Sequence, residues 1–104
     1  MIVFEPGDQI TIDFKDIVDG NKAAFDPTTV KFHYKPPDQS VTTVTYPASG
    51  TSRIATGWYR LLISIPYSVT SVGIWRVDAQ GLDGSSVSLL VEPIAFEVVS
   101  TGTL

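Results

Sequence analysis

Histidine is the side chain best suited to proton transfer at neutral pH, and the chain contains a single one, His33. A serine-histidine-aspartate arrangement would have to use His33 as its base. His33 stands between Lys31 and Lys35 in an alternating segment, which places all three on the polar face of a strand. Because nothing in the sequence places a serine or a carboxylate beside it, we expect a solvated surface histidine and no catalytic residue.

Carboxylates near the start of the chain offer the oxygen ligands that calcium prefers; they are Asp13, Asp16, Asp19 and Asp26. Their spacing is not that of an EF-hand loop. Asp19-Gly20 and Asp26-Pro27 are also explained by turn chemistry, since Gly tolerates positive φ and Pro fixes it. We therefore expect turn formers and solubilising charges, with no metal and no other cofactor, and calcium stays open as the minor alternative.

Aromatic side chains that can stack on sugar rings are Trp58, Tyr46 and Tyr67. A glycosidase would also need two carboxylates held at a fixed separation in a cleft, which a domain this small rarely forms. Each aromatic residue is as readily a core-edge or interface residue. The sequence thus predicts a protein that is not an enzyme, and a small hydrolase stays a minor alternative.

The charge balance argues against polyanionic partners. Seven Lys and Arg against eleven Asp and Glu give a net charge of −4. A basic patch could be formed by Lys15, Lys22, Lys31 and Lys35, but the carboxylates interleaved among Lys15 and Lys22 cancel most of its field. No window approaches the roughly 18 apolar residues of a membrane span, and the opening Met1 to Pro6 lacks a basic signal-peptide region. We expect binding neither to nucleic acid nor to a membrane, and an unprocessed, soluble chain.

The length of 104 residues predicts one domain, 1–104, with one core. There are no cysteines, which removes disulfides, thiolate metal sites and cysteine nucleophiles together. The fold must therefore be stabilised by packing alone.

Apolar residues alternate with polar ones along most of the chain, and Gly, Pro and Asp interrupt the alternation. This period of two predicts strands at 10–14, 30–35, 41–46, 58–65 and 73–79, with a short segment around Ile54. The loop Gly81 to Gly84 has the composition of a hairpin connection. Beyond it, two alternating runs, 87–91 and 94–98, flank Pro93, which predicts one last strand interrupted by a bulge or a change of sheet.

No segment shows the apolar spacing of an amphipathic helix over eleven or more residues. Seven or so strands without a helix predict an all-β, antiparallel two-sheet sandwich, with a small barrel as the second choice.

Four segments carry a resemblance to a known family: Pro6 to Ile12, Asp16 to Phe32, Gly57-Trp58-Tyr59 and Gly73-Ile74-Trp75. They resemble the short immunoglobulin-like proteins encoded among the structural genes of tailed bacteriophages and prophages. The resemblance implies an immunoglobulin-like sandwich, core positions for Tyr59 and Trp75, and a structural role in the virion as a capsid decoration, neck or tail component. The stretch from Leu82 to Pro93 is longer and more apolar than in that family.

The expected partners are accordingly other phage structural proteins, bound by many copies of the chain on the particle. The interface candidates are Trp58, Leu62 and Ile74, because each faces away from the predicted core of its strand. If both strands share a sheet, these residues form one outward apolar patch; loops covering that face are an equal alternative. The ends, 1–5 and 100–104, can also extend as arms onto a neighbour. A bacterial surface or carbohydrate-binding module of immunoglobulin-like type is the alternative function.

Overall fold

The computed structural model describes residues 2–18, 21–83, 87–90 and 94–100, which hold nine strands, one 3₁₀ turn and no α-helix. None of these elements is a helix long and apolar enough to cross a membrane. The elements in chain order are β1 (Ile2–Phe4), β2 (Gln9–Phe14), β3 (Thr29–Lys35), β4 (Thr42–Thr45), β5 (Thr51–Ala55), β6 (Trp58–Ser64), η1 (Val69–Ser71), β7 (Gly73–Asp83), β8 (Val87–Leu90) and β9 (Ile94–Val98).

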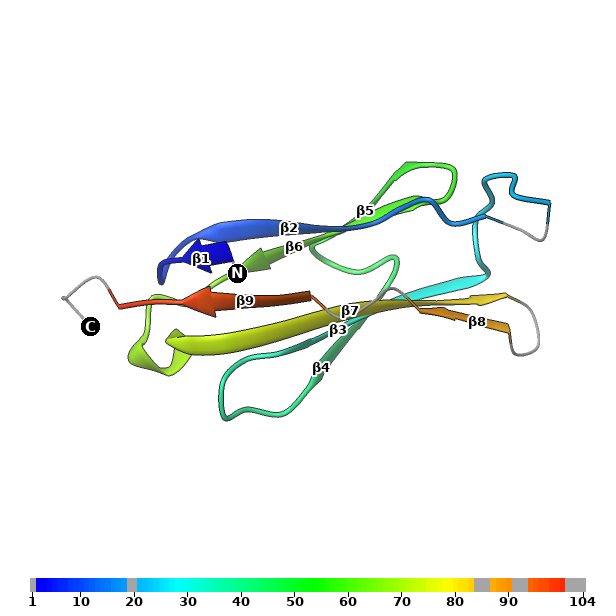
Figure 1. Ribbon diagram of the computed structural model, residues 1–104. Helices are drawn as coiled ribbons and strands as arrows, with labels where there is room; N and C mark the ends of the chain where they lie inside the picture. The colour runs from blue at the N-terminus through cyan, green and yellow to red at the C-terminus, as the bar shows by residue number, and fades with distance from the viewer. Residues whose placement is uncertain (1, 19–20, 84–86, 91–93, 101–104) are drawn as a thin grey trace.

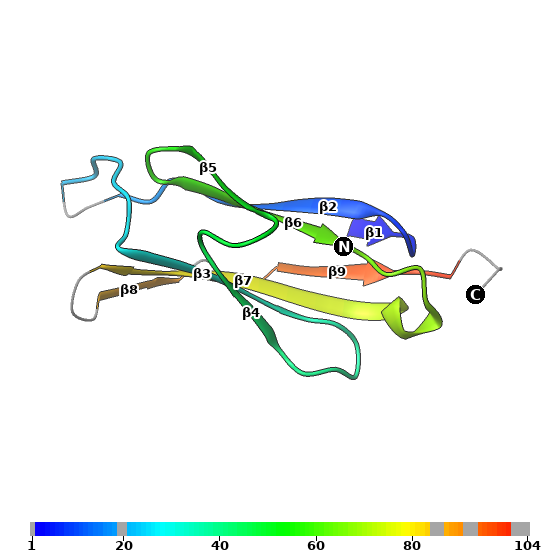
Figure 2. The ribbon, with the colours of Figure 1, turned by 180° about the vertical axis from the view of Figure 1, so that it is seen from behind.

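The strands form two sheets that lie face to face (Figures 1 and 2). The larger sheet has the order β1-β9-β7-β3-β4, and β8 pairs with the far end of β7; the smaller sheet has the order β2-β6-β5. The molecule is elongated, with extents of 50 × 25 × 23 Å. These layers confirm the prediction of an all-β, two-sheet fold.

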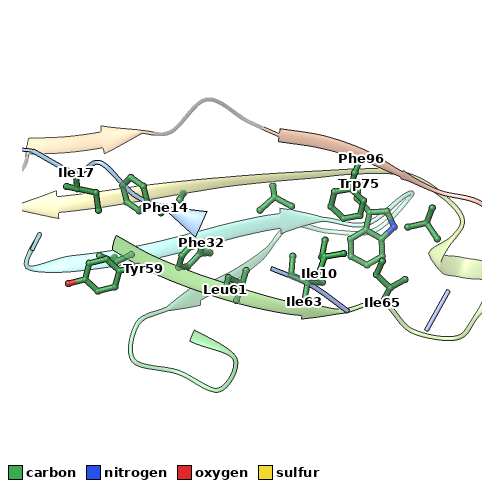
Figure 3. Close-up of a cluster of buried hydrophobic side chains, with 14 residues drawn as sticks. Ile10, Phe14, Ile17, Phe32, Tyr59, Leu61, Ile63, Ile65, Trp75 and Phe96 are labelled. Atoms are coloured by element: carbon green, nitrogen blue, oxygen red, sulfur yellow. The ribbon is translucent and has the colours of Figure 1, made fainter. Parts of the chain in front are cut away.

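Apolar side chains from both sheets fill the space between the layers (Figure 3). Aromatic rings make up the centre: Trp75 stacks on Phe96 with ring centroids 5.7 Å apart, and Tyr34 stacks on the other side at 6.3 Å. Burying such large side chains is the main source of stability in a chain without disulfides. The buried set is Ile10, Phe14, Ile17, Val30, Phe32, Tyr59, Leu61, Ile63, Ile65, Trp75, Val77, Ala79, Phe96 and Val98.

The predicted inside-outside alternation is confirmed on the four long strands. On β6, Tyr59, Leu61 and Ile63 are buried while the residues between them face outward, and β7 buries Trp75, Val77 and Ala79 in the same way. Pairing in the sheets fixes which residues share a face, because cross-strand partners point to the same side.

The interruption in the last strand does not involve a change of sheet. Both β8 and β9 pair with β7, but Gln80 lies opposite Leu90 whereas Val77 lies opposite Ile94. The register therefore shifts by one residue between the two strands, the odd step that the sequence predicts, and the residues that connect them, 91–93, lie outside the described ranges. The hairpin connection comes later than predicted, because β7 continues through Asp83, which lies opposite Val87.

The beginning of the chain differs from the prediction. Residues 2–4 form β1, which adds to the larger sheet in parallel with β9, with Val3 opposite Glu97. Phe4 packs edge-on against Phe96 at 5.4 Å, and its carbonyl accepts from the N–H of Val99. Residues 2–4 are therefore part of the larger sheet of this domain and do not extend as an arm. Because β1 and β9 are parallel, that sheet is mixed. The described residues hold nine strands where the sequence predicts seven or so. At the other end, residues 101–104 lie outside the described ranges.

A buried hydrogen bond fixes the turn between the two sheets. The indole N–H of Trp75 donates to the carbonyl oxygen of Ser71 at 2.8 Å, and the hydroxyl of Ser71 donates to the carbonyl of Pro66 at 2.8 Å. The chain crosses here from β6 to β7 through η1. These two bonds satisfy polar groups that the crossing would otherwise leave buried without partners.

Candidate interaction surface

The three predicted interface residues lie on two different surfaces. Trp58 and Leu62 belong to β6 in the smaller sheet, whereas Ile74 belongs to β7 in the larger one. All three face outward, as the alternation predicts, and Leu62 and Ile74 are about equally exposed at 41% and 40%. Because the sheets are packed face to face, their outer faces point in opposite directions. The condition for a single apolar patch is therefore not met.

Trp58 is covered by two cations. The Lys15 ammonium lies 5.6 Å from the centre of its ring and the Arg60 guanidinium 5.7 Å, both within the range of a cation-π contact. Arg60 also donates to the Asp13 carboxylate, with Nε 2.7 Å from Oδ1 and Nη2 3.4 Å from Oδ2. The indole is therefore half-buried under charged side chains, and it is not an open stacking surface.

Two of the four aspartates considered as calcium ligands, Asp13 and Asp26, form ion pairs with arginine. The hydrogen bond from Arg60 lowers the pKa of Asp13 below its ordinary value, against the opposing effect of burial. The hydrogen bond from Arg53, at 3.0 Å, followed by that from the Gly57 backbone N–H, at 2.9 Å, likewise lowers the pKa of Asp26. Asp16 has a positive φ and is exposed, as a turn residue would be, and Asp19 lies outside the described residues.

Asp26 also fixes a close approach of three chain segments. Gly57 joins β5 to β6 with φ +71°, and a Cβ there would lie 2.7 Å from the carbonyl oxygen of Ile17. Only glycine fits such a position without displacing backbone. Gly57 of the Thr56-Gly57 turn is therefore required by packing. Its backbone N–H donates to Asp26, which lies beside the β5–β6 hairpin.

The three aromatic residues considered for sugar stacking do not meet. Tyr46 is partly buried with its ring 5.0 Å from that of Tyr59, edge to face. Tyr67 lies in the β6–β7 crossing, 65% exposed, beside Gly7. Trp58 is on the outer face of the smaller sheet. No two of these three share a face, so they do not form a sugar platform.

The outer face of the larger sheet carries a groove of about 220 Å³ along β3 and β7. Val41, which precedes β4 and is 58% exposed, supplies an apolar side chain on one side. His33 and Lys35 line it from β3, and Arg76 and Asp78 line it from β7. The strands themselves form the floor, because Val77 points into the core.

Like charges face each other in this groove. Lys35 lies directly opposite Arg76 in the register of β3 and β7, and both are exposed. Within the described part of the chain, the two ion pairs present, Arg53 to Asp26 and Arg60 to Asp13, involve neither of them. Two like charges directly opposite each other destabilise a strand pair. Asp78 lines the same groove, but among the described residues it forms an ion pair with neither of them.

On the same face, Thr43, His33 and Asp78 lie side by side on β4, β3 and β7. They supply the hydroxyl, imidazole and carboxylate of a catalytic triad. His33 lies opposite Thr43 on β4 and opposite Asp78 on β7, and its Nδ1 is 3.0 Å from the Thr43 hydroxyl oxygen. The structure therefore places a carboxylate beside His33, which the sequence did not indicate. However, Asp78 Oδ1 is buried and, among the described residues, makes no hydrogen bond. The acid does not orient the imidazole, and a triad requires that link.

Sequence reasoning found Ile74 on this face but missed the groove. Alternation placed Lys35, Arg76 and Asp78 outward, which was the available signal. The alternation does not show which strands are neighbours. Only the pairing of β3 with β7 brings Lys35 opposite Arg76 and His33 opposite Asp78.

No family model matches the sequence, and no curated protein matches it. Among solved structures, the chain is similar to one in the structure described as "Structural basis of T cell specificity and activation by the bacterial superantigen toxic shock syndrome toxin-1". The TM-score is 0.60 at 11% identity, and the match covers 94% of this chain and 92% of that chain. The two chains are therefore of similar length, and the likeness concerns the fold alone.

Proposed function

We propose that this chain is an immunoglobulin-like, non-enzymatic structural protein of a tailed-bacteriophage virion, present in many copies and bound to other virion subunits. The observation that carries the binding role is the groove on the larger sheet, where Lys35 and Arg76 form no ion pair among the described residues and lie beside an exposed Val41. The assignment to a virion rests on the resemblance of the segments around Pro6 to Ile12 and Gly73 to Trp75 to phage structural proteins.

The strand order supports the immunoglobulin-like assignment. In a variable-type domain, strands G, F, C and C′ form one sheet and strands B, E and D lie in the other. Here β9-β7-β3-β4 and β2-β6-β5 stand in those places. The Trp75 bond to Ser71 also corresponds to the tyrosine corner, in which a ring near the start of strand F is tied to the backbone a few residues upstream.

A non-enzymatic role is supported by the small volume of the groove and by the hydrogen-bond partners of the residues that line it. Its volume of about 220 Å³ is below the roughly 300–1,000 Å³ of small-molecule sites. The unlinked Asp78 and the hydroxyl of Thr43 on Nδ1 leave His33 without an acid to orient it. A groove of this size suits the capture of one side chain from a partner.

Multi-copy attachment suits so small a surface. A typical stable protein interface buries about 1,600 Å² in total, or about 800 Å² on each partner, which is roughly an eighth of this chain's surface of 6187 Å² and far more than the groove alone provides. On a symmetric particle, subunits tethered to one another act at a high effective concentration, so weak contacts add up. A modest groove on each copy is then sufficient for retention.

Quantitative mass spectrometry of purified particles of the phage that encodes the chain tests this proposal. We expect the protein in particles at a fixed ratio to the major capsid or tail protein, and its loss when the gene is deleted. Its absence from intact particles would contradict the virion role. Binding in a glycan-array screen, blocked by Trp58→Ala, would instead favour the carbohydrate-binding alternative.

A further inference from the structure

We propose that the groove on the larger sheet binds an extended segment of a partner protein that carries an aspartate or glutamate two positions away from an apolar residue, so that both side chains point to the same side. This inference rests on the proposed function and names the chemistry of the partner. The apolar side chain packs against Val41, and the carboxylate lies between Lys35 and Arg76.

The two neighbouring cations determine that the bound segment carries a negative charge. Lys35 and Arg76 lie directly opposite each other, and no described carboxylate pairs with either of them. A carboxylate placed between them removes their mutual repulsion and forms charge-assisted hydrogen bonds. The chain as a whole is acidic, with a net charge of −4, so the preference is local and does not extend to a polyanion.

The apolar part of the surface continues past the charged pair. Ile74 is two residues before Arg76 on the same face of β7, and Val3 lies on that face in the row formed with Glu97. Both are exposed, at 40% and 53%. A segment that runs from Val41 across Lys35 and Arg76 therefore meets a second apolar contact, as in extended peptide recognition.

The test is a titration of the ¹⁵N-labelled full chain with a blocked five-residue peptide of leucine, threonine, glutamate, threonine and leucine, followed by NMR. We expect saturable shifts at residues 33–35, 41 and 76–78. Either K35E or R76E should raise the Kd about tenfold, the size of effect that loss of one charged contact gives. Lys31→Glu makes the same charge change on the same face of β3, outside the groove, and should leave the Kd within about twofold.

A second peptide with lysine in place of glutamate separates charge recognition from apolar contact. It should not bind the natural chain and should bind R76E. Equal binding of both peptides by the natural chain, shifts confined to another surface, or unchanged affinity in R76E would overturn the inference. If R76E fails to fold, Arg76→Gln replaces it, with the same expected direction.

Failure of this inference can be told apart from failure of the virion role. If R76E is incorporated into particles as well as the natural chain, the groove inference is wrong while the virion role stands. If the peptide binds but the protein is absent from particles, the virion role is wrong while the groove inference stands.

Discussion

Two tryptophans show how differently one residue type can serve this fold. The Trp75 indole is buried, and its N–H donates to Ser71. The Trp58 indole lies under Lys15 and Arg60, and among the described residues its N–H makes no hydrogen bond of standard geometry, although it lies close enough to the Asp13 carboxylate to help Arg60 lower the pKa of that group. The two rings therefore differ in the polar contact that a phenylalanine would remove.

Trp75→Phe is expected to lower the free energy of unfolding by about 2–3 kcal/mol. It leaves the buried carbonyl of Ser71 without a donor and removes core volume. Trp58→Phe is the matched control, and we expect it to cost less than about 1 kcal/mol because no hydrogen bond of standard geometry is lost. Urea denaturation followed by circular dichroism measures both. Equal losses in the two variants would contradict the role given to the Ser71 bond.

The two ion-paired aspartates give stability a defined dependence on pH. The pKa values of Asp13 and Asp26 are lowered in the folded chain by Arg60 and Arg53 respectively, from the ordinary 3.8. A carboxylate whose folded pKa is depressed contributes stability above its unfolded pKa, and this is lost as pH falls through the folded value. Stability should therefore decrease on acidification below pH 3.8.

Replacing both carboxylates tests this origin. In Asp13→Asn/Asp26→Asn, we expect a smaller drop in melting temperature between pH 5 and pH 2 than in the natural chain. Asp38→Asn, which removes an exposed carboxylate outside both ion pairs, is the control for the change in charge. An unchanged drop in the double variant would show that other groups dominate acid unfolding.

At the scale of elements, β1 is held by one aromatic contact and a few backbone bonds. Phe4 packs edge-on against Phe96 at 5.4 Å, whereas Ile2 is 64% exposed. Phe4→Ala should therefore cost about 2 kcal/mol, and Ile2→Ala within about 0.5 kcal/mol. Thermal unfolding measures the difference, and amide exchange should quicken at β1 and β9 in Phe4→Ala alone. Identical behaviour of the two variants would contradict the docking of β1.

The strands that the sequence predicts best are those with one wet face. In β2, β3, β6 and β7 each alternating residue is either core or surface, so the pattern itself carries the assignment. The segment β1 is only three residues long, and its exposed Ile2 and Val3 show no alternation. Its position is decided by the free edge of β9, a tertiary contact that no local pattern encodes.

At the scale of the whole molecule, pairing decides what alternation cannot. The sequence correctly turned Trp58, Leu62 and Ile74 outward, but it did not assign β6 and β7 to sheets. The assignment to opposite sheets separates the predicted patch into two faces. The same pairing creates the groove between Lys35 and Arg76, which are 41 positions apart in the chain and adjacent in the sheet.

The outer faces of the two sheets differ in whether their charged side chains form ion pairs. The outer face of the smaller sheet pairs its central charge, Arg60, with Asp13. The outer face of the larger sheet leaves Lys35 and Arg76 open beside Val41. On a particle, the larger sheet is therefore expected to face the supporting subunits and the smaller sheet the solvent.

Cryo-electron microscopy of the encoding phage, with and without the gene, tests the central claim most directly. We predict that density the size of one sandwich disappears from the head, neck or tail at symmetry-related positions. In particles that carry the protein, the β3–β7 face should lie against the neighbouring subunit. Identical particles with and without the gene would contradict the claim that this chain is part of the virion.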